Sequence, residues 1–167
     1  MEHHWRTEKI LDLEQAAITA AELKAQGKKI VTVNGAFDIV HAGHLDILEE
    51  AKQQGDVLVV GVNSDKSISD KKGPERPFIP QVERMAVLAA FICVDFVVLL
   101  DFPYDQAQDE LILAIKPDIH ANGSEYGNPS TWVDKAAMDK VGAKPYVVAR
   151  RPGLATSGII KKIQLTK

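Results

Sequence analysis

The sequence predicts an α/β protein built on a doubly wound, five-stranded parallel sheet. Short apolar segments rich in β-branched residues alternate with segments whose apolar residues recur at helical spacing. The strand-like segments are almost wholly apolar, as is typical of strands covered by helices on both faces. No Pro/Gly/Ser-rich linker and no internal repeat divides the 167 residues. Strands and helices in alternation form parallel sheets through right-handed crossovers, which leads to this fold class.

Each element is predicted from its local pattern. Apolar residues at helical spacing between Leu11 and Gln26 predict a first helix that ends at Gly27. The five strands are expected at Ile30–Val33, Val57–Val62, Phe96–Leu100, Asp118–Ala121 and Pro145–Ala149. Helices are expected at 45–51, Gln81–Phe91, Asp105–Ile115, Thr131–Val141 and Thr156–Leu165. The polar segment Ser69–Pro80, which contains one glycine and three prolines, is expected to be a loop.

Composition restricts the class of protein further. Twenty basic and twenty-three acidic residues give a formal charge of −3, which argues against a nucleic-acid or membrane-surface binder. The longest apolar run, Met85–Val94, is too short to span a bilayer, and Met1–Glu8 lacks the apolar core of a signal peptide. The single cysteine, Cys93, fits a reducing compartment. We therefore expect one soluble cytoplasmic domain over residues 1–167, with 1–28 as a helical lead-in.

Chemistry is expected just after the first strand, because doubly wound sheets bind ligands at the carboxyl ends of their strands. The segment 34–38 (Asn-Gly-Ala-Phe-Asp) follows that strand, and Gly35 allows a tight turn and the close approach of a ligand. His41 and His44 begin the next helix, three positions apart, so that both rings project to one side. Gly43 between them leaves room for a phosphate, and a helix N-terminus attracts anions. The pattern predicts a phosphate clamp.

The histidine pair has other interpretations. On composition alone, His41 and His44 are equally well explained as surface residues at the start of a helix. A zinc site is disfavoured because Cys93 is the only thiol and no third ligand lies nearby, so no protein-bound metal is predicted. The chain has neither a Gly-x-Gly-x-x-Gly turn after the first strand nor a Walker Gly-Lys-Ser/Thr motif. Nicotinamide enzymes and P-loop NTPases are thereby disfavoured.

The pattern Asn-Gly-x-Phe-Asp-x-x-His-x-Gly-His at 34–44 resembles the signature of the cytidylyltransferase-like nucleotidyltransferases, which have a Rossmann-like fold. Further matching segments cover nearly the whole chain: Ala51-Lys52, Gly55-Asp56, 61–65, Lys72-Gly73, Arg76-Pro77, Glu83-Arg84, Val94-Asp95 and Pro117-Asp118. The chain is most similar to the adenylyltransferase domain of bacterial ADP-heptose synthases. Glycerol-3-phosphate cytidylyltransferases resemble it less.

The resemblance implies transfer of a nucleotide to a phosphorylated small molecule, with release of pyrophosphate. The acceptor phosphate attacks the α-phosphorus directly, so positioning and charge stabilisation are the catalytic demands. The expected reaction uses ATP and a sugar 1-phosphate, most similar to heptose 1-phosphate. The alternatives are CTP with glycerol 3-phosphate or a similar alcohol phosphate, and a nucleotide-binding regulatory protein without turnover. A separate sugar kinase is expected upstream, and a homodimer is compatible with the sequence.

The resemblance also assigns roles to residues. His41, His44 and Lys72 are the expected catalytic residues; without the resemblance, Lys72 fits a solvated basic loop with Lys71 and Arg76. Mg²⁺ is expected to bind through the triphosphate, because no compact carboxylate cage is evident. The expected nucleotide contacts are Gly35, Ala36, Phe37, Gly43, Asn122, Gly123, Glu125, Arg150, Thr156 and Ser157.

Several expected contacts have simpler explanations or depart from the family pattern. Asp38 and Arg84 are expected to contact the acceptor; bracing of the turn by Asp38, and a carboxylate partner for Arg84, are the alternatives. Helix capping is the alternative for Thr156 and Ser157. The segment 122–126 reads Asn-Gly-Ser-Glu-Tyr where the heptose enzymes typically have Lys-Gly-Gly-Asp-Tyr, a departure close to the expected nucleoside site.

Overall fold

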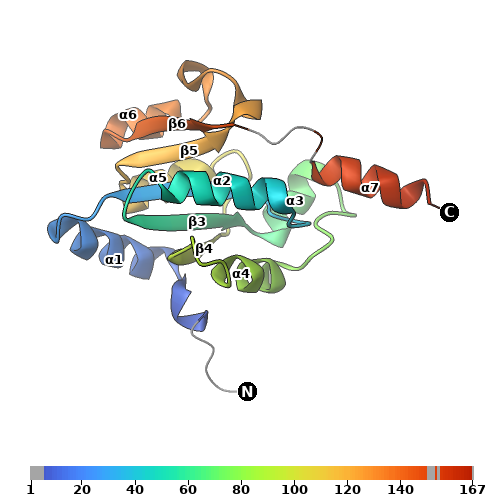
Figure 1. Ribbon diagram of the computed structural model, residues 1–167, viewed down its shortest axis with the longest axis horizontal. Coiled ribbons are helices and arrows are strands. Elements are labelled where there is room, and N and C mark those ends of the chain that lie inside the picture. The colour runs from blue at the N-terminus through green and yellow to red at the C-terminus, as the bar shows by residue number, and fades with distance from the viewer. Residues whose placement is uncertain (1–5, 150–152, 154, 167) are drawn as a thin grey trace.

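The computed structural model describes residues 6–149, 153 and 155–166, which form a six-stranded, wholly parallel sheet (Figure 1). The strand order is β1-β4-β3-β2-β5-β6, so β2 lies between β3 and β5. The chain thus reverses its direction across the sheet at β2, which opens a crevice at the carboxyl ends of β2 and β5. The strands are β1 (Ile10–Leu11), β2 (Ile30–Gly35), β3 (Val57–Asn63), β4 (Phe96–Leu100), β5 (Ile119–Gly123) and β6 (Lys144–Val148).

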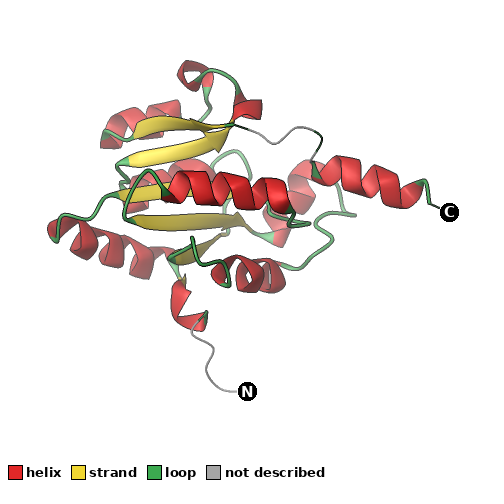
Figure 2. Cartoon of the chain, viewed as in Figure 1, coloured by secondary structure: helices red, strands yellow, loops and turns green. Residues whose placement is uncertain are grey.

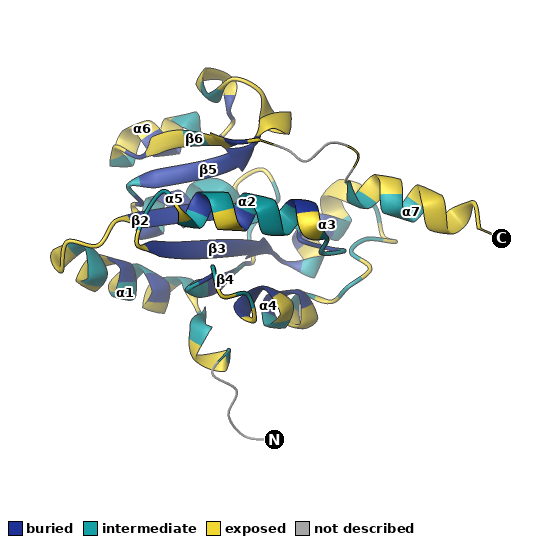
Figure 3. Ribbon diagram, in the orientation of Figure 1, coloured by how far each residue is buried: buried dark blue, intermediate teal, exposed yellow. Residues whose placement is uncertain are grey.

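Helices cover both faces of this sheet (Figure 2). One face carries α2 (Ala42–Lys52) and α4 (Gln81–Ala89), and the other carries α1 (Leu13–Ala25), α5 (Ala107–Ile115) and α6 (Lys135–Val141). Every residue of β3 is buried, which explains its unbroken apolar sequence (Figure 3). None of the helices in the described residues is long and apolar enough to cross a membrane.

The predicted fold class is confirmed, but the predicted number of five strands is wrong. The sixth strand is β1, where Ile10 and Leu11 pair with Val97 and Val98 of β4 at the edge of the sheet. Two residues are too few to produce a recognisable strand pattern. Residues 10 and 11 therefore belong partly to the sheet, rather than only to a helical lead-in.

The segment after β3 also differs from its prediction. Helix α3 (Asp65–Lys72) occupies the beginning of the expected loop Ser69–Pro80. It begins at Ser64, whose side chain accepts a hydrogen bond from the Ser67 N–H, and it ends at Gly73 with φ 98°. The helix is strongly polar because it buries only Ser67 and Ile68, which explains why its sequence resembles a loop.

The expected helix Thr131–Val141 is shorter in the structure. Its first residue ends a 3₁₀ turn, Pro129–Thr131, and α6 itself begins at Lys135. The last helix, α7 (Thr156–Gln164), lies close to its predicted bounds and begins beside the crevice. Arg150 lies outside the described residues, so its nucleotide contact stays a prediction.

Candidate active site

The turn after β2 is fixed by a buried carboxylate. Asp38 is 3% exposed, accepts hydrogen bonds from the Phe78 and Ile79 N–H groups at 2.7 and 2.9 Å, and forms an ion pair with Arg76 at 2.6 Å. The backbone of Phe37 is left-handed, with φ 47°, and its ring lies over Gly35, where a Cβ would come within 3.2 Å of it. Asp38 therefore braces the turn, as the alternative interpretation expected, and it forms an ion pair with Arg76. Asp38 also lines the cleft described below, so its contact with the acceptor stays a prediction.

The side chain of Arg84 likewise forms its bonds within the fold. Its guanidinium is fully buried and donates to the carbonyl oxygens of Ala36, Asn63 and Ile79, and it pairs with Asp65 at 2.7 Å. These bonds tie the turn after β2 to the end of β3 and to α4. Arg84 lines none of the cavities described below, so its position differs from the expected acceptor contact and matches the alternative of a carboxylate partner.

The two histidines form a stacked pair at the N-terminus of α2. His41 Nδ1 accepts the Gly43 N–H at 3.1 Å, and His44 Nδ1 accepts the His41 N–H at 3.3 Å. The ring centres lie 4.0 Å apart with 28° between their planes. A ring nitrogen that accepts an N–H carries no proton, so in this arrangement both imidazoles are neutral and carry their proton on Nε2. The pair offers two Nε2–H donors at the positive end of a helix.

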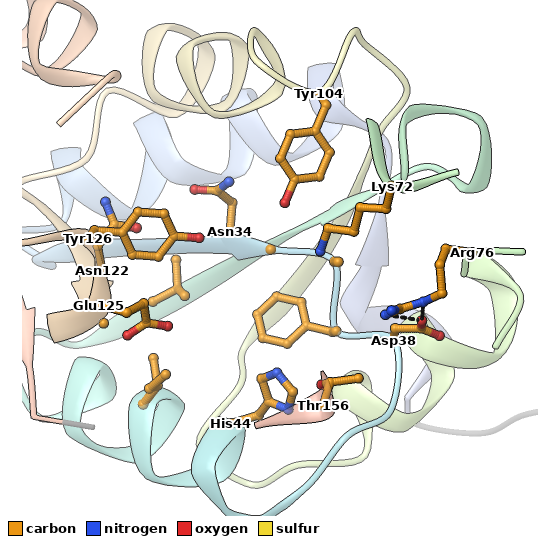
Figure 4. A pocket seen from close by; sticks show the side chains of 16 residues that line it. Asn34, Asp38, His44, Lys72, Arg76, Tyr104, Asn122, Glu125, Tyr126 and Thr156 are labelled. Atoms are coloured by element: carbon orange, nitrogen blue, oxygen red, sulfur yellow. Dashed lines mark hydrogen bonds and ion pairs between the residues drawn. The ribbon is translucent and has the colours of Figure 1, made fainter. Parts of the chain in front are cut away.

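A cleft of about 160 Å³ opens beside His44, at the carboxyl ends of β2 and β5 (Figure 4). An adjoining cavity contains His41 and Ser157 and shares several side chains with the cleft. Together they bring residues of β2, α2, α3, β5 and α7 to one place. Of the expected site residues, these two cavities are lined by Gly35, Ala36, Phe37, Asp38, His41, Gly43, His44, Lys72, Asn122, Gly123, Glu125, Thr156 and Ser157.

The two neighbouring lysines occupy different environments. Lys72, the last residue of α3, lines the cleft, and its Nζ lies 5.5 Å from the centre of the Tyr104 ring. Lys71 instead pairs with Asp105 at 2.8 Å on the exposed surface. Lys72 therefore lies at the end of a helix rather than in a loop, and its ammonium faces the same cleft as His44.

Glu125 contributes a carboxylate to the cleft through the bend after β5. A Cβ at Gly123 would lie 2.1 Å from Glu125 Oε2, so the absence of a side chain at 123 lets this carboxylate fold back over the strand end. Two acidic side chains line the cleft. One of them, Asp38, already forms an ion pair with Arg76 and accepts hydrogen bonds from backbone N–H groups. Glu125 is thus available to a ligand.

Sequence reasoning missed a second cavity that adjoins the cleft. Three asparagines at strand ends, Asn34, Asn63 and Asn122, line it together with Asp134. Behind them a buried chain of contacts runs from Thr32 through His120 to Asp134. An asparagine recurs at the carboxyl end of three strands, and this recurrence in the sequence could have indicated the cavity. Among the described residues, no group of three or more His, Cys, Asp or Glu side chains is arranged to hold a metal ion.

Comparison with known proteins agrees with this geometry. The family model described as "Cytidylyltransferase-like" matches residues 32–165, which include both histidines, Lys72 and the start of α7. The chain belongs to this family. The bifunctional protein HldE of Methylobacillus flagellatus is 40% identical over 95% of this chain, and that of Geobacter metallireducens is 43% identical over 89%. The chain spans about a third of the length of these curated relatives.

Solved structures resemble this member of the cytidylyltransferase-like family over most of its length. A lipopolysaccharide core biosynthesis protein from Thermoplasma volcanium is 27% identical, with a TM-score of 0.59, and the match covers 75% of this chain and 98% of that one. A pantoate-beta-alanine ligase from Francisella tularensis is 18% identical, with a TM-score of 0.68, over 92% of this chain and 72% of the ligase. The second likeness concerns the fold alone.

Proposed function

We propose that this protein is an adenylyltransferase that transfers AMP from ATP to heptose 1-phosphate and releases pyrophosphate. The observation that carries the proposal is the stacked pair of neutral histidines at the N-terminus of α2, which lines the adjoining cavity together with Lys72. Similarity to the HldE proteins over nearly the whole chain supports the adenylyl and heptose assignments over cytidylyl transfer to glycerol 3-phosphate. The resemblance to ADP-heptose synthases supports the same choice.

The reaction requires an oxygen of the acceptor phosphate to attack the α-phosphorus of ATP while the bond from that phosphorus to the bridging oxygen of pyrophosphate breaks. Negative charge then grows on the phosphoryl oxygens and on the departing pyrophosphate. The Nε2–H groups of His41 and His44 are fixed donors for these oxygens, because backbone N–H groups hold both rings by Nδ1. Lys72 supplies a positive charge beside them, and Thr156 and Ser157 offer hydroxyls at the N-terminus of α7.

Mg²⁺ fits this cleft as a companion of the triphosphate. Glu125 is the available carboxylate of the cleft, and Mg²⁺ prefers oxygen ligands while keeping several waters. The ion would neutralise charge on the departing pyrophosphate. The acceptor would be supplied by a sugar kinase acting earlier, and neither a nucleic acid nor a membrane takes part.

A pyrophosphate-release assay tests the proposal. ATP and CTP are each combined with heptose 1-phosphate, glycerol 3-phosphate and other sugar 1-phosphates, with Mg²⁺ or with excess chelator. We expect the highest kcat/KM for ATP with heptose 1-phosphate, and loss of activity in chelator. A kcat/KM for CTP equal to or above that for ATP would overturn the adenylyl assignment. Nucleotide binding without any turnover would indicate a regulatory protein.

A further inference from the structure

The second cavity has a volume of about 280 Å³ and adjoins the phosphate-binding cleft. It shares Asn34, Tyr104, Asn122 and Tyr126 with the cleft, and in Figure 4 these side chains lie across the cleft from His44. Neither His41, His44 nor Lys72 lines it. A ligand whose phosphate lies in the cleft can therefore extend its other end into this cavity.

Buried polar atoms in the wall of this cavity have no hydrogen-bond partner within the described part of the chain. They are Asp134 Oδ1, Asn63 Nδ2 and Asn34 Oδ1. Asp134 is 3% exposed and Asn63 is 1% exposed, so solvent does not readily satisfy them. Buried polar groups are normally paired, and groups that are not paired call for an explanation.

The environment of Asp134 keeps one carboxylate oxygen free. His120 Nε2 lies 3.0 Å from Asp134 Oδ2, and the Asn122 amide donates to the same oxygen at 3.2 Å, so that Oδ1 is left over. Thr32 Oγ1 lies 2.8 Å from His120 Nδ1, which orients the ring from its other side. Burial raises the pKa of Asp134, but His120 and Asn122 outweigh it and lower the pKa overall. Asp134 is thus an ionised hydrogen-bond acceptor at neutral pH.

We infer that this cavity binds the hydroxyl groups of the acceptor sugar, an inference that rests on the proposed function of the cleft. A carboxylate oxygen and an amide oxygen accept, while an amide nitrogen donates, and sugar hydroxyls do both. The indole of Trp132 adds an apolar wall for the C–H face of a sugar ring. A nucleobase carries fewer donors than a polyol. Asp134 and Asn63 are therefore the residues expected to determine acceptor specificity.

Kinetics of Asp134→Asn test this inference. The variant keeps the shape of the side chain but removes the charge that accepts from hydroxyls. We expect the KM for heptose 1-phosphate to rise about 10- to 100-fold, the range for losing a hydrogen bond to a charged group, while the KM for ATP stays within about two-fold. The matched control is Asp139→Asn on α6, an exposed carboxylate that pairs with Lys135 and lies outside the cavity. It should change neither constant.

Asn63→Ala serves as the second variant if Asp134→Asn does not fold, as judged by its circular dichroism spectrum. It is expected to raise the KM for the sugar phosphate in the same selective way. A rise in the KM for ATP alone would assign the cavity to the nucleoside and overturn the inference. Unchanged constants in a folded variant would also overturn it, because the network would then be only structural.

A separate measurement distinguishes failure of the cavity from failure of the proposed function. If the wild-type protein does not turn over heptose 1-phosphate, the proposed function fails. Calorimetric titration of heptose 1-phosphate, with glycerol 3-phosphate as the ligand with fewer hydroxyls, then still tests the cavity. Tighter binding of the sugar phosphate, weakened in Asp134→Asn, supports the inference. Equal binding by wild type and variant, or no binding to either, overturns it.

Discussion

Replacement of His44 by alanine separates the two roles that the structure gives this side chain. Its Nδ1 accepts the His41 N–H at the start of α2, and in the proposed reaction its Nε2–H donates to a phosphoryl oxygen. Loss of one donor to the transition state costs about 2.7–4 kcal/mol, so we expect kcat to fall about 10²- to 10³-fold. Loss of the capping interaction costs about 1 kcal/mol, which lowers Tm by about 2–4 °C for a protein of this size.

The control for this variant is Gln15→Ala on α1. Gln15 Oε1 accepts the Asp12 N–H at 3.2 Å in the same kind of capping box, and Gln15 lines neither the cleft nor its two adjoining cavities. We expect a comparable fall in Tm by differential scanning calorimetry, with pyrophosphate release unchanged. A His44→Ala variant that keeps its kcat would remove the imidazole from the mechanism. A fall in kcat matched by Gln15→Ala would show that helix stability alone limits activity.

Three further predictions concern the cleft and its surroundings. Lys72→Ala should lower kcat/KM in the pyrophosphate assay about 10- to 100-fold, whereas Lys71→Ala, which breaks only an exposed ion pair, should not. Gly123→Ala should raise the KM for ATP several-fold by displacing the Glu125 carboxylate, with the free energy of unfolding changed by less than about 0.5 kcal/mol. The folded protein holds the pKa of Asp134 below its unfolded value, so the free energy of unfolding should decrease as the pH is lowered below about pH 4. Urea unfolding at several pH values should show a smaller decrease for Asp134→Asn than for the wild type.

The fold was predictable to the extent that its elements are long and apolar. β3 and β4 have strong local patterns because both faces of the sheet are covered. β1 has only two residues, and its pairing with β4 depends on contacts far along the chain. The polar helix α3 depends on the Ser64 cap and on two buried residues, so hydrophobic periodicity alone cannot detect it.

The site divides in the same way between local and distant determinants. His41 and His44 were predictable because one helix turn sets their geometry. The role of Arg84 was not, since its guanidinium bonds partners 48 and 21 residues away, at Ala36 and Asn63. Sequence alone does not say whether a cation pairs within the scaffold or faces a ligand. A charged residue is assigned reliably only when its partners are also local.

The strand-end asparagines show what additional knowledge would have revealed the second cavity. Asn63 ends β3, Asn34 lies one residue before the end of β2, and Asn122 lies one residue before the end of β5. Because β3, β2 and β5 are adjacent in the sheet, three residues spread over nearly 90 positions meet at one edge. Polar residues are unfavourable in the wholly apolar strands of a covered parallel sheet unless something at that edge satisfies them. The strand order thus places the three asparagines side by side, where they form one polar wall of the cavity. We expect the acceptor hydroxyls to bind at this wall.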